Sequence, residues 1–307
     1  MIVANGSSFY SVEKRTEPFP IPVTTMEAAK LVDNGTLLIP KFDPNTDVPP
    51  VVGCNNAGGI KILVIGRPGS GKSHFIKWLL MCKASTIPAF VVMSNTERES
   101  KFYSKFVPEA YVYDEYSTDV LRKVMKRQKS VVHEKGKTPW LALVVDDCAS
   151  NLKQLKGDDL KVQEEILKNG RHWKMVYIVG VQDLMDVKLP HRQLFDYVFL
   201  YGITNEKRVL AVYDNHASLM FKNIGQFKQV FSFVTNTPYR SLMFRNNTQD
   251  LTKALAWCMV PKEYPSFKVG CIEYRCFSKH MMINRDGQVE RSDPEEALYS
   301  DEDEPAR

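Results

Sequence analysis

The chain has 307 residues with 44% hydrophobic and 25% charged residues, which suits one large α/β domain with extensions and excludes a disordered or fibrous protein. Its net charge of +5 divides unevenly: residues 293–307 carry −6, so residues 1–292 carry +11, and this basic body favours either a polyanionic partner or a solvated lysine-rich surface. No apolar run reaches the ~18 to 20 residues of a membrane helix, and the first residues lack a secretory signal. The six cysteines include no CxxC pair, which indicates reduced thiols. We therefore expect a soluble intracellular protein.

Residues 1–58 are rich in Pro, Asn and Gly, and we expect them to form an N-terminal extension. Within it, the sequence predicts a helix at about residues 25–33 and an apolar run at 37–39. We expect the core domain to span residues 59–250. Residues 251–307 are expected to form a C-terminal extension that ends in a disordered acidic tail.

Strands and helices are expected to alternate through the core. The apolar patterns predict strands at 62–65, 89–93, 140–145, 175–181, 197–201 and 239–244, and helices after residue 71 and at about 118–134, 158–170, 205–217 and 221–232. This alternation predicts an α/β fold with a mostly parallel sheet and helices on both faces. The helix at 118–134 has a basic face, which is either solvated or a contact for DNA or a protein partner.

A glycine-rich segment opens the first core helix. Residues 66–73 read Gly-Arg-Pro-Gly-Ser-Gly-Lys-Ser and match GxxxxGK[ST] between a buried strand and a helix. The glycines let the backbone aim N–H groups at phosphate oxygens, and the helix N-terminus adds positive potential. Lys72 is expected to reach the β- and γ-phosphates of ATP, and Ser73 to bind Mg²⁺. The expected nucleotide-binding residues are Gly66, Arg67, Pro68, Gly69, Ser70, Gly71, Lys72, Ser73 and His74.

Two acids end a later apolar strand, Ala142-Leu-Val-Val-Asp146-Asp147. We expect Asp146 to hold Mg²⁺, directly or through its water. Asp147 would orient or deprotonate the attacking water. Many related sites have glutamate at the second position, and the alternative is that the two acids merely cap the strand.

Gln182 ends the next strand. In P-loop proteins with an extra strand between the phosphate-loop strand and the acid-bearing strand, this residue points at the γ-phosphate and the attacking water. An amide both donates and accepts, which suits that position, although an ordinary loop amide is the alternative.

An arginine from a neighbouring subunit often stabilises the transition state in ring-forming NTPases. Arg171, in Asn-Gly-Arg-His, and Arg192, in Leu-Pro-His-Arg, are both candidates. We favour Arg171; each arginine has an ordinary surface or DNA-facing role as its alternative.

Together, these motifs resemble one family over about residues 60–245: the genome-packaging ATPases of poxviruses and other nucleocytoplasmic large DNA viruses, in the FtsK–HerA superfamily with an ASCE/RecA-like fold. The resemblance implies that Lys72 and Ser73 take the nucleotide, and that Asp146 takes the magnesium. It also implies that Asp147 and Gln182 act on the water and Arg171 on the neighbour's nucleotide.

The resemblance further implies a homo-oligomeric ring that moves double-stranded DNA, without sequence preference, into a preformed viral capsid. Partners would include capsid or inner-membrane components, and the site of action would be assembly sites in the host cytoplasm and the virion. The alternatives are another oligomeric nucleic-acid translocase, a P-loop kinase of a small molecule, and a slow nucleotide switch that serves as a scaffold.

Overall fold

The computed structural model describes residues 19–22, 32–33, 36–51, 57–134, 138–248, 250 and 253–286. The helix expected at about 25–33 lies largely outside these residues, and its last two positions, Val32–Asp33, form a strand instead. The acidic tail also lies outside them. In the described part of the chain, no helix combines the length and apolar character that crossing a bilayer requires.

The core of the molecule is an eight-stranded sheet in the order β11-β10-β9-β4-β8-β7-β5-β6. The six strands from β9 to β6 are parallel, and β10 and β11 continue the sheet in antiparallel fashion. The strands are β4 (Ile60–Ile65), β5 (Ala89–Ser94), β6 (Val112–Tyr113), β7 (Leu141–Asp146), β8 (Met175–Val181), β9 (Tyr197–Leu200), β10 (Arg240–Arg245) and β11 (Leu255–Met259). The predicted, mostly parallel α/β sheet is therefore confirmed.

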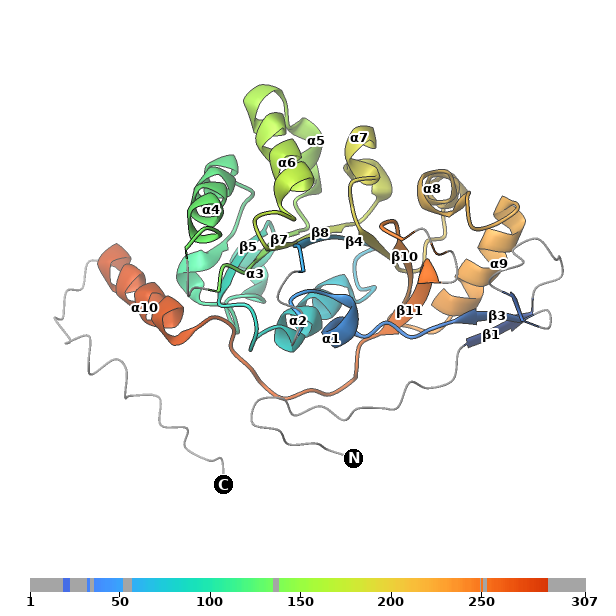
Figure 1. Ribbon diagram of the computed structural model, residues 1–307, viewed down its shortest axis with the longest axis horizontal. Helices are drawn as coiled ribbons and strands as arrows, with labels where there is room; N and C mark the ends of the chain where they lie inside the picture. Colours follow the sequence, from blue (N-terminus) through green and yellow to red (C-terminus); the bar gives the residue numbers. More distant parts are fainter. Residues whose placement is uncertain are drawn as a thin grey trace.

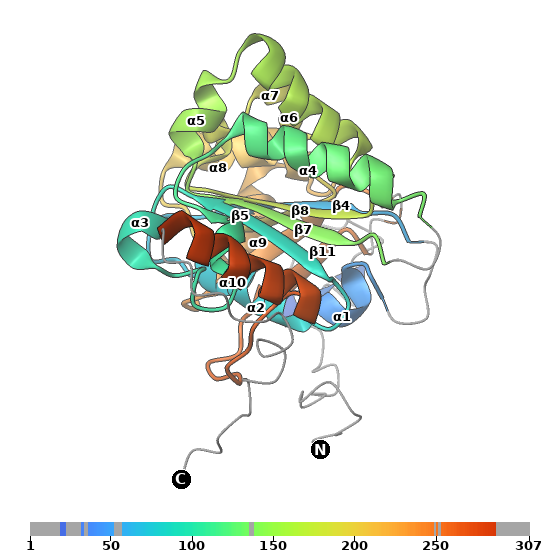
Figure 2. The same cartoon turned by 90° about the vertical axis from the view of Figure 1, so that its left-hand side faces the viewer.

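Helices cover both faces of this sheet (Figures 1 and 2). One face carries α4 (Thr118–Val131), α5 (Ala149–Gln154), α6 (Gly157–Asn169), α7 (Leu189–Arg192) and α8 (Glu206–Val212), and α9 (Ile224–Thr235) packs into the same hydrophobic cluster. The other face carries α1 (Pro44–Asp47) and α2 (Lys72–Cys82). The helix α10 (Ile272–Asp286) lies beyond the edge of the sheet formed by β5 and β6. Short elements fill the connections: α3 (Glu97–Ser100), η1 (Glu109–Tyr111), η2 (Leu184–Asp186) and the π-helix η3 (Tyr213–Ala217).

Alternation along the central strands explains the two layers. In β4, Leu63 and Ile65 join the hydrophobic cluster under α4 and α6, while Ile62 and Val64 join the cluster around α2. Successive side chains of a strand point to opposite faces, so a continuous apolar strand fills a core on both sides. Because β4 is the fourth of the eight strands, its carboxyl end and the phosphate loop after it lie near the middle of the sheet.

The sheet and its packing extend past both expected limits of the core. Phe42 lies 4.9 Å from the ring of Phe199, and a three-stranded sheet in the order β1-β3-β2 is formed by Phe19–Pro22, Thr36–Ile39 and Val32–Asp33. On the other side, β11 pairs with β10, so the expected boundary at residue 250 falls between two hydrogen-bonded strands. The strands and helices predicted from the sequence did not include β11 or α10.

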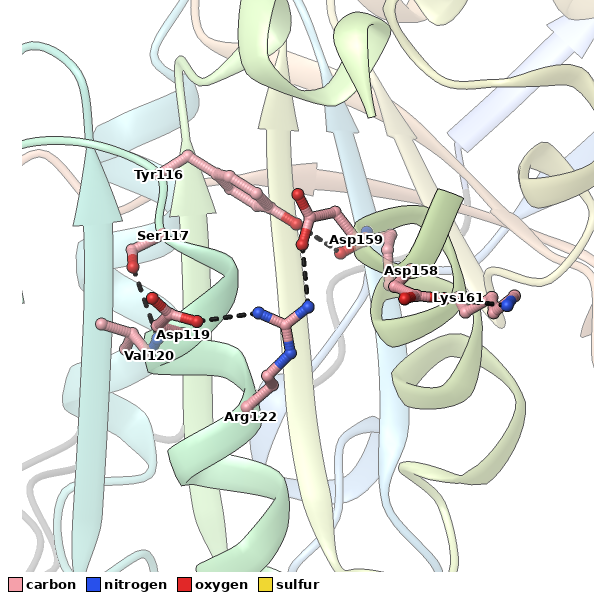
Figure 3. A network of polar contacts seen from close by, with 9 residues as sticks. Tyr116, Ser117, Asp119, Val120, Arg122, Asp158, Asp159 and Lys161 are labelled. Atoms are coloured by element: carbon pink, nitrogen blue, oxygen red, sulfur yellow. Dashed lines mark hydrogen bonds and ion pairs between the residues drawn. The ribbon is translucent and has the colours of Figure 1, made fainter. Parts of the chain in front are cut away.

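The basic face of α4 is partly neutralised within the chain. Figure 3 shows Arg122 between Asp119 of its own helix and Asp159 of α6, with N–O distances of 2.7 and 2.9 Å. Lys129 pairs in the same way with Glu165 of α6 at 2.6 Å. Two of the basic residues of α4 thus tie it to α6, and such exposed pairs stabilise a protein only slightly. The basic residues of this helix are Arg122, Lys123, Lys126, Arg127 and Lys129.

A buried histidine makes the fold sensitive to acid. His216 in η3 is 6% exposed, and burial lowers the pKa of its imidazole to about 4, although a contact with the Asn246 side chain at 3.3 Å opposes the shift. Below the ordinary pKa of about 6.5, the unfolded chain takes up a proton that the folded chain does not. Stability from this group is therefore present above pH 6.5 and is lost as the pH falls towards 4.

We predict that the free energy of unfolding falls by about 2 kcal/mol between pH 7 and pH 5 because of His216 alone. Denaturant unfolding at the two pH values measures it. A His216→Gln variant lacks the titrating group, so its loss over this interval should be smaller by that amount. An equal loss in both proteins would show that His216 does not titrate in this way.

Candidate functional site

The phosphate loop joins β4 to α2 at the carboxyl edge of the sheet. Gly69 and Gly71 have φ angles of 74° and 103°, in the left-handed region that glycine adopts without strain. Gly71 caps α2, and a side chain there would meet the ring of Tyr239 at 3.1 Å. Arg67, Pro68, Gly69 and His74 are exposed, whereas Gly66 is buried. The loop therefore presents an open backbone turn at the N-terminus of an 11-residue helix.

Lys72 points back toward the second acid of the predicted pair. Its ammonium lies 3.4 Å from Oδ1 of Asp147, and the Lys72 side chain is 5% exposed. The contact is an ion pair without a hydrogen bond, because Asp147 Oδ1 has no hydrogen-bond partner among the described residues. Asp147 has φ 53°, and its N–H donates to the carbonyl of Gly180 at 3.1 Å. This turn of the backbone brings its carboxylate to the phosphate-loop lysine.

Asp146 lies deeper and is held by two hydroxyl groups. Ser73 Oγ and Tyr103 OH both donate to its Oδ2, at 2.8 and 2.7 Å. Asp146 is 1% exposed, and burial raises the pKa of its carboxyl, as does the charge of Asp147, while the two hydroxyls and Lys72 oppose the shift. Burial and the charge of Asp146 likewise raise the pKa of Tyr103 well above its ordinary value, so its phenol stays protonated and donates.

The residues at this point fit a magnesium ion. Oδ1 of Asp146 is buried and has no hydrogen-bond partner among the described residues, and the Ser73 hydroxyl lies against the same carboxylate. Magnesium prefers carboxylate, hydroxyl and phosphate oxygens. Ser73 and Asp146 would hold the ion, which would supply charge neutralisation for the phosphates of a nucleotide.

Gln182 lies between the phosphate loop and the acids. β8 runs between β4 and β7, as the sequence predicted. At its carboxyl end, the carbonyl of Val181 accepts from the N–H of Gly66 at 3.1 Å, and Gly180 accepts from Asp147. Gln182 follows directly and is exposed. Its position agrees with a role toward a γ-phosphate and a water, and that role stays a prediction.

The two candidate arginines have different surroundings. Arg171 is exposed and lies at the amino end of β8, where its carbonyl accepts from Gly59 at 2.8 Å. The seven residues of β8 span about 23 Å, so Arg171 lies too far from the carboxyl edge to reach the nucleotide site of its own chain. Arg192 is 7% exposed, and its Nε donates to the carbonyl of Val187 at 2.9 Å, which fixes a turn inside the chain. Of the two, Arg171 is the one with an exposed side chain.

Three residues at the site were not predicted from the sequence. Tyr103 comes from a loop that the apolar pattern left without structure, and Tyr239 lies beside Gly71 with φ 64°. Gly180 interrupts an apolar strand, and a Cβ at this position would lie 2.1 Å from Oδ1 of Asp146. A glycine within a buried strand was the one available signal, since it marks close approach of another group.

The fold and this arrangement of phosphate loop, paired acids and strand-terminal glutamine define a protein of the P-loop NTPase class. The DNA-packaging ATPase B204 of Sulfolobus turreted icosahedral virus has the same fold, with a TM-score of 0.50 and 19% sequence identity over 67% of this chain and 100% of that one. No protein-family model matches the chain.

Sequence relatives come from large DNA viruses. The uncharacterized protein 075L of Invertebrate iridescent virus 6 is 36% identical over 245 residues, which cover 78% of this chain and 93% of the relative. The uncharacterized protein 088R of Invertebrate iridescent virus 3 is 35% identical over 232 residues, covering 74% and 87%. The chain belongs to this family of nucleocytoplasmic large DNA virus proteins, as its motifs predicted.

We predict that Gly180→Ala weakens magnesium-dependent nucleotide binding at least about 10-fold, because its methyl group displaces the Asp146 carboxylate. The same overpacking should lower the free energy of unfolding by about 1–3 kcal/mol. Binding of a fluorescent ATP analogue in Mg²⁺ measures the first effect. Gly202→Ala is the matched control, because a Cβ there meets Thr235 at an ordinary 3.8 Å. Unchanged binding in Gly180→Ala would contradict the close approach.

Proposed function

We propose that this protein hydrolyses ATP as a subunit of a ring that moves double-stranded viral DNA into a preformed capsid. The observation that carries the hydrolytic part is the convergence at one sheet edge of Lys72, the Ser73–Asp146 hydrogen bond at 2.8 Å and the Asp147 carboxylate. Such a set can bind a nucleoside triphosphate with Mg²⁺ and place a carboxylate near the attacking water.

In this proposal, each group acts at a stated position. The loop N–H groups and Lys72 bind the β- and γ-phosphates, and Ser73 and Asp146 hold Mg²⁺, which neutralises phosphate charge. Asp147 exchanges its contact with Lys72 for the attacking water, which it orients or deprotonates. Gln182 hydrogen-bonds the same water and the γ-phosphate, and so senses cleavage.

The DNA part of the proposal rests on family and charge. The relatives are proteins of large DNA viruses, and a protein with the same fold is described as a DNA-packaging ATPase. The basic body of the chain agrees with non-specific contacts to a phosphate backbone. Capsid or inner-membrane components would be the partners at the assembly site in the host cytoplasm.

We predict that long double-stranded DNA stimulates steady-state ATP hydrolysis, and that added salt weakens the stimulation, because DNA binding releases counterions. Lys72→Ala should reduce turnover by about 100-fold or more. Lys161→Ala, at an exposed lysine of α6, is the control and should retain normal turnover. Turnover that is indifferent to DNA would instead favour a small-molecule kinase or a scaffold switch.

We predict that Arg171 acts on the nucleotide of the neighbouring subunit. Arg171→Ala and Lys72→Ala should each be inactive alone, yet a mixture should recover activity, because some interfaces combine an intact Lys72 with an intact Arg171. The control mixture is Lys72→Ala with Asp147→Asn, in which no interface gains a complete site. ATPase assays of the mixtures measure the recovery, and its absence with Arg171→Ala would show that Arg171 does not act on the neighbour's nucleotide.

A further inference from the structure

Tyr103 is a buried side chain that the proposed hydrolysis does not use. It is 1% exposed and lies on the loop of residues 101–107, which follows α3 and is here called the Tyr103 loop. Its phenol donates to Oδ2 of Asp146 at 2.7 Å. Oδ2 accepts a second hydrogen bond from Ser73, whereas Oδ1 has no hydrogen-bond partner among the described residues. The two oxygens of one carboxylate are thus made different by their surroundings.

A second acid fixes the Tyr103 loop. Glu97, in α3, is 4% exposed, and its two carboxylate oxygens accept from the N–H of Tyr103 and the N–H of Ser104, each at 2.9 Å. The hydroxyl of Ser104 donates to the same group at 2.8 Å. Hydrogen bonds to a charged acceptor are roughly twice as strong as neutral ones. Glu97 therefore fixes the backbone from which the Tyr103 phenol reaches Asp146.

Aromatic packing holds the other side of the loop. The ring of Phe106 lies 5.1 Å from that of Phe267, and its carbonyl accepts from the N–H of Val269 at 2.9 Å. Lys77 of α2 lies 5.3 Å from the centre of the Phe106 ring. The loop is thus confined between α2 and the segment that follows β11, and Tyr103 has little freedom to leave Asp146.

We propose that Tyr103 is a positioning residue for magnesium: its phenol holds the Asp146 carboxylate in the orientation in which Oδ2 meets the Ser73 hydroxyl, and Glu97 keeps the phenol in place. The inference rests on the proposed nucleotide site and deepens it. Groups that hydrogen-bond a metal ligand fix its orientation, and their loss typically weakens metal affinity about 10- to 100-fold. Removing the phenol oxygen should therefore loosen Mg²⁺ while the phosphate-binding N–H groups and Lys72 stay in place.

The test compares nucleotide binding with and without magnesium. A fluorescent ATP analogue is titrated in Mg²⁺ and in EDTA, and the ratio of the two dissociation constants measures the gain from the ion. In EDTA, Tyr103→Phe should bind the ATP analogue as tightly as the wild type does. Its gain in affinity on adding Mg²⁺ should be about 10-fold smaller than that of the wild type. Glu97→Gln should reduce the gain in the same direction. This readout requires no hydrolysis.

The matched control is Tyr177→Phe. Tyr177 is also fully buried, and its phenol donates to Gln163 at 3.1 Å, away from the site. It should lose similar stability and keep the full gain from Mg²⁺. An equal gain in Tyr103→Phe and the wild type would overturn the role of Tyr103 and leave the nucleotide site intact. A wild-type protein that binds no nucleotide would overturn the site itself, and the role of Tyr103 with it.

Discussion

The site is organised around one buried carboxylate. Asp146 ends a strand that is buried along its whole length, and a charge at that depth is tolerable only where hydrogen bonds or a cation compensate it. Ser73 brings the start of α2 to it, and Tyr103 brings the Tyr103 loop. Gly180 on the neighbouring strand leaves the room it needs. Three segments far apart in sequence are therefore fixed by the requirement to satisfy one group.

Parallel strands explain why these segments meet. Because β4, β7 and β8 run in the same direction, their carboxyl ends lie at one edge, and each connection there can carry a polar group. The order β4-β8-β7 sets Gln182 between the phosphate loop and the acids. The arginine at the amino end of β8 lies at the far edge. In a ring where the amino edge of one subunit faces the carboxyl edge of the next, Arg171 of the first subunit would lie near the nucleotide site of the second.

The sequence predicted the sheet, and it identified Lys72, Ser73 and the two acids that the structure brings together, because these signals are local. Two signals each lie within about eight residues: a glycine-rich turn after a buried strand, and a pair of acids at the end of another strand. The role of Tyr103 could not be predicted, because it depends on the shape of a loop, and that shape is set by hydrogen bonds to Glu97. Contacts made across the fold, such as the one between Tyr103 and Asp146, leave little trace in local periodicity. β11 is a different case, because it lies in an apolar run at residues 254–260 that is a local strand signal, and the expected domain boundary at residue 250 left it out.

The course of the chain after β11 has a consequence for synthesis. From β11, at one edge of the sheet, it runs past α2 to α10 beyond the other edge, as Figure 1 shows, and on the way Phe267 and Val269 pack on the Tyr103 loop. These residues leave the ribosome after the phosphate loop, the paired acids and Gln182 have all been translated. A nascent chain can form its central strands early, since domains fold from the N-terminus onward. The packing behind Tyr103 forms after those strands, so we expect the Tyr103 loop to be fixed only once Phe267 and Val269 have left the ribosome.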